Sequence, residues 1–77
     1  LTAKVLCVDD NPDVVYSTAA LLEAVGFEVR TAPSGEEALR VAPDFGPHAC
    51  VLDIAMPGMT GYELAGRLRA MLGSVYL

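Results

Sequence analysis

Runs of apolar residues mark two buried strands. From Lys4 to Val8, and again from Ala49 to Leu52, nearly every position is apolar. Unbroken Val, Leu and Cys over this length is typical of a strand that is covered on both faces, as in a parallel sheet. Residues 27–31 instead alternate apolar and polar side chains, which predicts a further strand near the edge of the same sheet.

The segment between the predicted strand at Lys4–Val8 and the predicted strand at residues 27–31 has the spacing of a helix. Asn11 is a good N-cap, and Pro12 fits the first turn because its missing N–H would have no partner there. Gly26 is a natural terminator for this helix. Between these ends, apolar and small residues recur at helical spacing: Val15, Thr18, Ala19, Leu22 and Val25.

A capping box predicts the second helix. Ser34 precedes Glu37 by three residues. In this motif the hydroxyl accepts from the backbone N–H of the glutamate, and the glutamate side chain reaches back to the backbone N–H of the cap. The helix is expected to run through Val41, and Pro43 and Pro47 are expected to end it and to stiffen the following loop.

A second capping box, Thr60 with Glu63, opens a helix over Gly61–Leu72 that Gly73 closes. Its expected buried side holds Leu64, Ala65, Leu68, Met71 and Leu72. Residues 74–77 have the composition of another strand. Strands and helices in alternation predict an α/β fold whose parallel strands are joined by right-handed crossovers.

Length and composition limit the chain to one small domain. Its 77 residues are 53% apolar, which is high for a solitary soluble domain of this size. No apolar run approaches the roughly 20 residues of a membrane-spanning helix, so we expect no membrane contact. The net charge of −5, with only five scattered Lys and Arg, argues against direct contact with nucleic acid by this domain.

Cys7 and Cys50 each lie inside a predicted strand. Their spacing does not resemble a zinc or redox motif, so we interpret both as small buried hydrophobic residues in a reducing compartment. The first residues of the chain also do not resemble a signal peptide. We therefore expect a cytoplasmic protein.

Carboxylates follow both buried strands. Asp9 and Asp10 come after the first strand, and Asp53 comes after the second, with a Pro-Gly loop and a capped helix behind it. The carboxyl ends of neighbouring parallel strands meet at one sheet edge, where ligands collect. Three carboxylates at that edge repel one another, and a hard divalent cation such as Mg²⁺ relieves the repulsion because it prefers oxygen ligands.

Each acid receives a role on this basis. We assign Asp10 as a direct Mg²⁺ ligand and Asp9 as a ligand through water or in the outer shell, while Asp53 and the backbone carbonyl of Ala55 each supply one oxygen. Asp53 is also the predicted nucleophile, because an aspartate can attack phosphorus directly and form an acyl phosphate. The chain offers no Gly-rich phosphate loop and no Ser elbow to compete with it.

Together these motifs resemble the receiver domain of two-component response regulators and hybrid sensor histidine kinases. The resemblance rests on residues 4–11, 26–39 and 51–64, and on the separation of the acidic pair from Asp53. It implies a flavodoxin-like, doubly wound parallel sheet with the strand order 2-1-3-4-5. It also implies that Asp53 takes a phosphoryl group from a phosphohistidine on a sensor histidine kinase or a histidine phosphotransfer protein, with Mg²⁺ bound. Such a domain is a regulatory phosphoacceptor and not an enzyme.

The resemblance covers about the N-terminal three-fifths of the family pattern. The family has five strand–helix units, whereas residues 1–77 hold three and the predicted start of a fourth strand. By the same resemblance, a Ser or Thr and a Lys that contact the phosphoryl group lie beyond residue 77. We therefore expect residues 1–77 to be an incomplete receiver domain from a longer chain, or a homo-oligomer in which a second copy covers the open sheet edge.

Two alternative functions are weighed beside the phosphoacceptor. A pseudo-receiver would use the same fold only for protein interaction or dimerisation, and the intact set of three acids argues against it. A metal-dependent phosphohydrolase would also form an aspartyl phosphate, but such enzymes typically carry a second Asp two residues after the nucleophile. That position is Ala55 here, which makes the hydrolase the weakest alternative.

Overall fold

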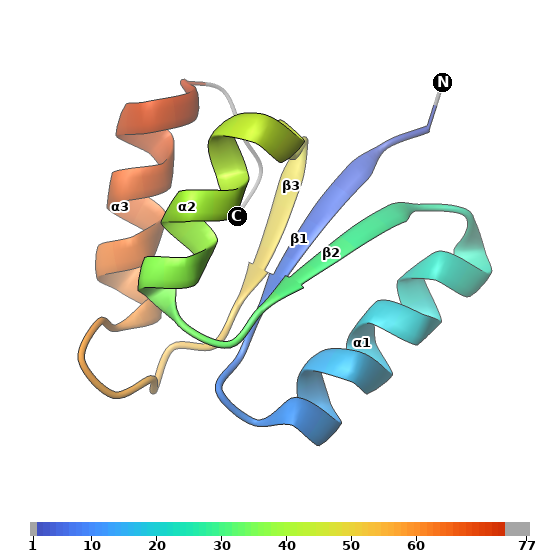
Figure 1. Cartoon of the computed structure of the whole chain (residues 1–77), viewed down its shortest axis with the longest axis horizontal. Coiled ribbons are helices and arrows are strands. Elements are labelled where there is room, and N and C mark those ends of the chain that lie inside the picture. The colour runs from blue at the N-terminus through green and yellow to red at the C-terminus, as the bar shows by residue number, and fades with distance from the viewer. Residues whose placement is uncertain (1, 74–77) are drawn as a thin grey trace.

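Three parallel strands alternate with three helices in residues 2–73, the part of the chain that the computed structural model describes (Figure 1). The elements are β1 (Lys4–Val8), α1 (Pro12–Val25), β2 (Glu28–Ala32), α2 (Gly35–Phe45), β3 (Ala49–Leu52) and α3 (Gly61–Leu72). The strand order is β2-β1-β3, which agrees with the first three strands of the predicted 2-1-3-4-5 sheet. The strand predicted at residues 74–77 lies outside the described residues.

β1 is the central strand because its side chains are apolar toward both faces of the sheet. Val5, Leu6, Cys7 and Val8 are all buried. α1 covers one face of the sheet, while α2 and α3 cover the other (Figure 1). Since side chains alternate along a strand, Val5 and Cys7 face α1, and Leu6 and Val8 face α2 and α3.

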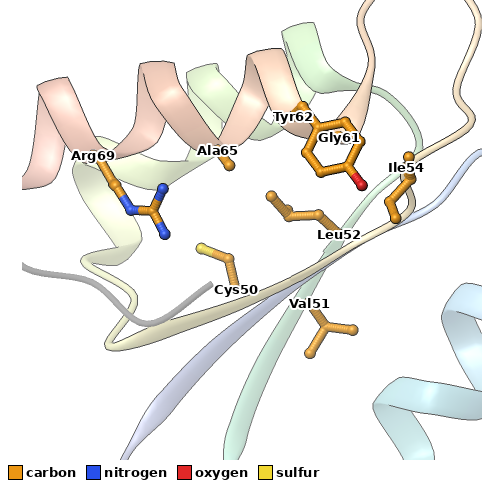
Figure 2. Close-up of a pocket in the computed structure, with 8 residues that line it drawn as sticks. All are labelled: Cys50, Val51, Leu52, Ile54, Gly61, Tyr62, Ala65 and Arg69. Carbon is orange, nitrogen blue, oxygen red and sulfur yellow. The ribbon is translucent and has the colours of Figure 1, made fainter.

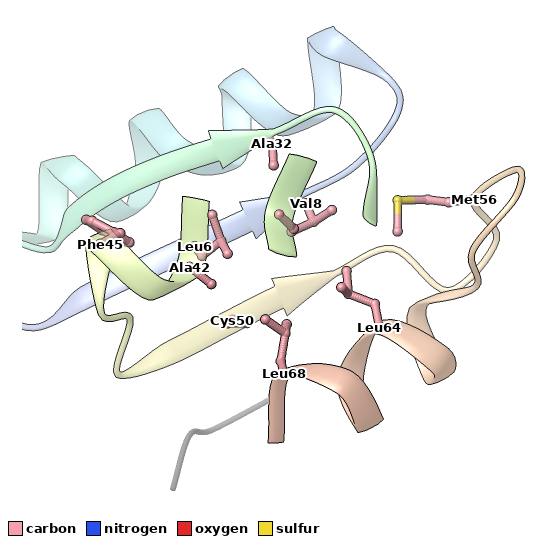
Figure 3. Close-up of a cluster of buried hydrophobic side chains, with 10 residues drawn as sticks. Leu6, Val8, Ala32, Ala42, Phe45, Cys50, Met56, Leu64 and Leu68 are labelled. Atoms are coloured by element: carbon pink, nitrogen blue, oxygen red, sulfur yellow. The ribbon is translucent and has the colours of Figure 1, made fainter. Parts of the chain in front are cut away.

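The larger core lies between the sheet and the helices α2 and α3 (Figure 3). Its buried members are Leu6, Val8, Ala32, Ala38, Ala42, Phe45, Cys50, Met56, Leu64 and Leu68. The smaller core, under α1, consists of Val5, Cys7 and Val15. One face of the sheet is therefore packed much more extensively than the other. None of the described helices is both long and apolar enough to cross a membrane.

The predicted N-caps are present, but the capping boxes are only half formed. Ser34 Oγ accepts from the N–H of Glu37 at 3.2 Å, and Thr60 Oγ1 accepts from the N–H of Glu63 at 3.2 Å. The expected return bonds from the two glutamate side chains are not found within residues 2–73. The Glu37 carboxylate instead pairs with the exposed Arg40 guanidinium, 2.7 Å away and one helical turn further on.

β2 begins one residue later than predicted, because Phe27 belongs to the end of α1. Gly26 adopts a left-handed conformation with φ +113°. The N–H of Phe27 then donates to the carbonyl of Leu22 at 3.1 Å, which closes the last turn of α1 and removes Phe27 from the strand ladder. Residues 27–31 do alternate, but the first apolar residue of the pattern, Phe27, is hydrogen-bonded to α1 and not to the sheet.

The prediction that Pro43 ends the second helix is wrong. α2 continues through Pro43 to Phe45 and ends at Gly46, which has φ +63° and donates its N–H to the carbonyl of Ala42. A proline this close to the end of a helix removes only one backbone donor. Ala42 and Phe45 are both buried in the larger core, and their burial favours the additional turn.

One side chain predicted to be buried is exposed, and so is one position of the helical pattern on α1. Leu64 and Leu68 are fully buried and Leu72 packs against them, but Met71 is 47% exposed because it lies round the helix from that line. On α1, Val15 is buried, whereas Val25 in the last turn is 73% exposed. Helical spacing alone did not distinguish the covered stripe from its neighbours.

The edge of the sheet at the amino ends of the strands is fastened by His48, a role that the sequence did not predict. The N–H of His48 donates to the carbonyl of Lys4 at 2.8 Å, and its Nδ1 accepts from the N–H of Lys4 at 2.9 Å. Nearby, the Lys4 ammonium and the Arg30 guanidinium lie 5.8 Å and 5.3 Å from the centre of the Phe45 ring. Two cationic side chains therefore lie over one aromatic ring at the edge opposite the three acids.

Candidate functional site

Parallel pairing brings the carboxylates that follow β1 and β3 to the same edge of the sheet. Val8 is the register partner of Leu52, so Asp9 and Asp53 are the next residues on neighbouring strands. The ladder continues one step into both of them. The N–H of Asp53 donates to the carbonyl of Val8 at 2.9 Å, and the N–H of Asp9 donates to the carbonyl of Ala32 at 3.2 Å.

The three predicted acids converge at this edge. One carboxylate oxygen each from Asp9, Asp10 and Asp53 lies within 4.8 Å of the other two. Asp9 and Asp53 are partly buried, while Asp10 is exposed. Three carboxylates at this separation repel unless protons or a cation intervene.

Backbone N–H groups hold two of the acids in place. Asp53 Oδ1 accepts from the N–H of Ala55 at 3.1 Å, and Asp9 Oδ1 accepts from the N–H of Asn11 at 2.9 Å. Both are Asx-type turns, in which a short carboxylate fixes the backbone two residues on. Each turn engages one oxygen and leaves the second for another ligand. The backbone of Ala55 thereby lies directly beside the Asp53 carboxylate.

This set of donors fits a hard divalent cation. All of the candidate ligands from Asp9, Asp10 and Asp53 are carboxylate oxygens, the type that Mg²⁺ and Ca²⁺ prefer. Mg²⁺ typically takes one or two carboxylates and keeps several waters, and an exposed edge leaves room for those waters. The three carboxylates therefore form a ligand set that suits such an ion.

The loop between β3 and α3 is anchored at several points. Met56 is buried in the larger core, and Met59 packs against the same core. At the start of α3, the N–H of Gly61 donates to the carbonyl of Ile54 at 3.0 Å. The residues that follow Asp53 are thus fixed by contacts with α3 and the core and not only by the end of the strand.

The two cysteines are buried free thiols, as predicted. Burial raises the pKa of Cys50 to about 11, with a smaller contribution from neighbouring Cys7, and burial also raises the pKa of Cys7. The thiolate is the nucleophilic form of cysteine, so burial disfavours reaction at either side chain. They do not compete with Asp53.

A groove lies between β3 and α3 (Figure 2). Cys50 and Leu52 point toward α3, whereas Val51 points to the other side of the sheet. At one end of the groove Ile54 and Tyr62 are 54% and 73% exposed. Within the described residues, β3 pairs only with β1. These features agree with the expected apolar surface along this strand.

Comparison with known proteins agrees with the geometry. A family model described as the response regulator receiver domain matches residues 5–75. The chain belongs to this family. The resemblance predicted from the sequence is thereby confirmed, as is the flavodoxin-like fold. Receiver domains of response regulators are modules of two-component systems, so this chain is a two-component signalling domain.

Curated relatives are longer than this chain. The transcriptional regulatory protein PrrA of Mycobacterium tuberculosis is 50% identical over 68 residues, which are 88% of this chain and 29% of PrrA. The chain therefore spans less than a third of PrrA.

Solved receiver structures superpose closely. The chemotaxis protein CheY4 of Vibrio cholerae has a TM-score of 0.89 and 37% identity, over 92% of this chain and 59% of CheY4. The response regulator TrrA of Thermotoga maritima, in complex with Mg²⁺-BeF, has a TM-score of 0.85 and 37% identity over 91% of this chain and 61% of TrrA. A second TrrA structure, with the histidine kinase ThkA, has a TM-score of 0.82 and 38% identity over 90% of this chain and 60% of TrrA.

Proposed function

We propose that Asp53 accepts a phosphoryl group from a phosphohistidine and that Mg²⁺ bound at the same acids assists the transfer. The observation that carries this proposal is the convergence of Asp9, Asp10 and Asp53 within 4.8 Å at the carboxyl edge of the sheet. The phosphorylated and unphosphorylated forms would then be the two states of a signalling switch. The domain is regulatory and promotes only its own phosphorylation.

The chemical step needs one free carboxylate oxygen. The N–H of Ala55 donates to Asp53 Oδ1, which leaves Oδ2 free for an incoming phosphorus. As the bond from Oδ2 to phosphorus forms, the bond between phosphorus and the imidazole nitrogen breaks. The electron pair stays on that nitrogen, and the product is an acyl phosphate. The Ala55 N–H holds the carboxylate in one orientation throughout.

The other acids divide the metal ligation between them. Asp10 is exposed and accepts no hydrogen bond within residues 2–73, so its carboxylate is available as a direct ligand. Asp9, whose Oδ1 accepts from the N–H of Asn11, is proposed to act through water or in the outer shell. Asp53 and the carbonyl of Ala55 supply the remaining protein oxygens. Mg²⁺ bound here would neutralise negative charge on the oxygens of the transferring group.

The phosphodonor is proposed to be a sensor histidine kinase or a histidine phosphotransfer protein. Two observations on relatives support the partner and the ion: TrrA has been solved with the histidine kinase ThkA, and also with Mg²⁺-BeF. Both complexes are of TrrA, and they motivate tests of kinase and Mg²⁺ binding for this chain. A cytoplasmic location, without direct contact of this domain with nucleic acid or membrane, is part of the same proposal.

A second candidate function is a protein-interaction module that is never phosphorylated. It is favoured by large apolar side chains that stay exposed on α1 and beside β3, among them Leu21 at 69%, Val25 at 73% and Tyr62 at 73%. A homo-oligomer that covers the β3 edge would bury part of this surface. Light scattering on the purified chain reports this association directly.

Intact-mass measurement separates the two functions. We expect the chain to gain the mass of one phosphoryl group when it is incubated with acetyl phosphate and Mg²⁺, and to gain none when the metal is chelated. Asp53→Asn should abolish the gain. Asp13→Asn is the matched control, because Asp13 is an exposed aspartate in the first turn of α1, outside the acidic cluster. A gain that persists in Asp53→Asn contradicts the phosphoacceptor proposal, as does the absence of a gain in a version of the protein that also carries the fourth and fifth strand–helix units of the family pattern.

A further inference from the structure

We propose that Gly61, the first residue of α3, is a positioning residue for Asp53. The absence of a side chain at Gly61 lets α3 rest directly on the main chain that carries the Asp53 carboxylate. The consequence for metal binding and phosphorylation rests on the function proposed above. The contact itself is independent of that function.

The space at Gly61 is closed by backbone. A Cβ atom added there would collide with the carbonyl oxygen of Asp53 and would lie only 2.9 Å from both the carbonyl carbon of Asp53 and the Cα of Ile54. Real Cβ atoms essentially never come this close to another heavy atom. A flexible side chain can rotate away from such a contact, but the main chain at the end of β3 cannot.

The need for glycine at this position is steric and not conformational. The glycines with positive φ are Gly26, Gly46, Gly58 and Gly73, and Gly61 is not among them. Gly61 is buried and has helical geometry, which an alanine would adopt more readily. The N–H of Gly61 also donates to the carbonyl of Ile54 at 3.0 Å, so a hydrogen bond as well as packing holds the start of α3 against the end of β3.

A displacement of the main chain beside Gly61 is transmitted to the Asp53 carboxylate through Ile54 and Ala55. The peptide between Asp53 and Ile54 lies against Gly61, and the next N–H along the chain belongs to Ala55, which holds Asp53 Oδ1 at 3.1 Å. A methyl group on Gly61 must displace this peptide or move the first turn of α3 away from it. Either movement changes the position of the Asp53 carboxylate relative to Asp9 and Asp10.

Two other glycines provide controls within the same molecule. Gly66 lies in the same helix, and a Cβ atom added there would meet nothing within 4 Å beyond its own helix, so Gly66→Ala should be tolerated and should favour the helix. At Gly35 an added Cβ would lie 2.7 Å from Met59 Sδ and 3.2 Å from Met59 Cβ and Cγ, so its three nearest contacts are all with one side chain and none is with backbone. Gly35→Ala should therefore be relieved by movement of Met59, which has no equivalent at Gly61.

The test compares Gly61→Ala with Gly66→Ala in the full chain. In metal-free protein, we expect the NMR amide signals of Asp53, Ile54 and Ala55 to shift in Gly61→Ala and to stay in place in Gly66→Ala. Mg²⁺ affinity, followed by titration of the same signals, should fall roughly tenfold or more in Gly61→Ala, as for other groups that orient metal ligands from outside the coordination shell. The rate of phosphorylation by acetyl phosphate should fall with it.

A core variant distinguishes positioning from general destabilisation. Phe45→Leu, in the larger core at the opposite edge of the sheet, should lower stability while leaving Mg²⁺ affinity within about twofold of the parent. The proposal is overturned if Phe45→Leu loses as much affinity as Gly61→Ala, or if Gly61→Ala keeps both the parent affinity and the parent amide signals. Failure of the parent to bind Mg²⁺ rejects the proposed function, but the metal-free amide signals still decide the role of Gly61.

A measurement on the parent protein covers the case in which Gly61→Ala does not fold. If α3 rests on the Asp53 peptide, Mg²⁺ binding should shift the Gly61 amide with the same midpoint as the Asp53 amide, while the Gly66 amide stays still. A Gly61 amide that does not respond overturns the proposal.

Discussion

The two faces of the sheet use the same strands very differently. The cluster under α2 and α3 has ten buried members, whereas the cluster under α1 has three. β3 shows the contrast within adjacent positions, since Cys50 is 4% exposed toward α3 and Val51 is 47% exposed on the other side. We expect an apolar residue to contribute to stability according to how completely a helix covers it, and not only according to the hydrophobicity of its strand.

The largest effect is expected on the well-covered face. Leu68 is fully buried between α3 and the sheet. We expect Leu68→Ala to lower the free energy of unfolding by about 2–5 kcal/mol, because it removes buried methyl groups and leaves a cavity. Urea unfolding with an unchanged m-value would measure this loss. A loss below about 1 kcal/mol would mean that this face is less tightly packed than its burial indicates.

The cysteines on the two faces give a pH-dependent comparison. The pKa of Cys50 is about 11 in the folded protein, against an ordinary value of 9.0. Between these two pH values the thiol keeps its proton when the protein is folded and loses it on unfolding, so rising pH favours the unfolded state. The stability that this thiol contributes is complete below pH 9.0 and is lost as the pH approaches 11. The loss is on the order of 2 kcal/mol.

The free energy of unfolding should therefore fall less steeply between pH 9.0 and about 11 in Cys50→Ala than in the parent. Cys7→Ala is the paired variant on the α1 face, where burial also raises the thiol pKa, and its effect should be the smaller of the two. Equal pH dependence in the parent and in Cys50→Ala would show that the Cys50 thiol is more accessible to water than its burial suggests.

A smaller effect is expected under α1. Val15 is 5% exposed and is the helix residue of the smaller core. Val15→Ala removes two methyl groups, and we expect a loss of about 1.5 kcal/mol in the free energy of unfolding. If Val15→Ala destabilised the protein as much as Leu68→Ala, the contrast between the two faces would fail.

The smallest effect is expected on the outer surface of α1. Leu21 is 69% exposed, so Leu21→Lys should change the free energy of unfolding by no more than about 0.5 kcal/mol. The same variant tests association. If α1 surfaces meet in a homo-oligomer, light scattering should report a lower mass for Leu21→Lys than for the parent protein, whereas an unchanged mass would place any association elsewhere.

Most of the fold was predictable because local signals and packing agree. The apolar runs gave the bounds of β1 and β3 correctly, and the Thr60 cap and Gly73 gave those of α3. The errors arose where tertiary contacts override local preference. Burial of Phe45 extends α2 past Pro43, and the N–H of Phe27 is used by α1 and not by the sheet.

The candidate site was predictable to the level of its acids. Parallel strands place their carboxyl ends together, so Asp9 and Asp53 had to meet once the strands were recognised. The role of Gly61 was not predicted, because its reason is a contact with the main chain of another element. A glycine in the first turn of a helix, where alanine is the better helix former, was the available signal.

The central place of β1 has a consequence for the order in which the chain folds. β1 joins β2 after one short crossover, but it must close a much longer loop to join β3. Loop-closure entropy rises with loop length and opposes the more distant pairing. We therefore expect β1 and β2 to pair before β3 docks, so that the acidic edge is completed late in folding.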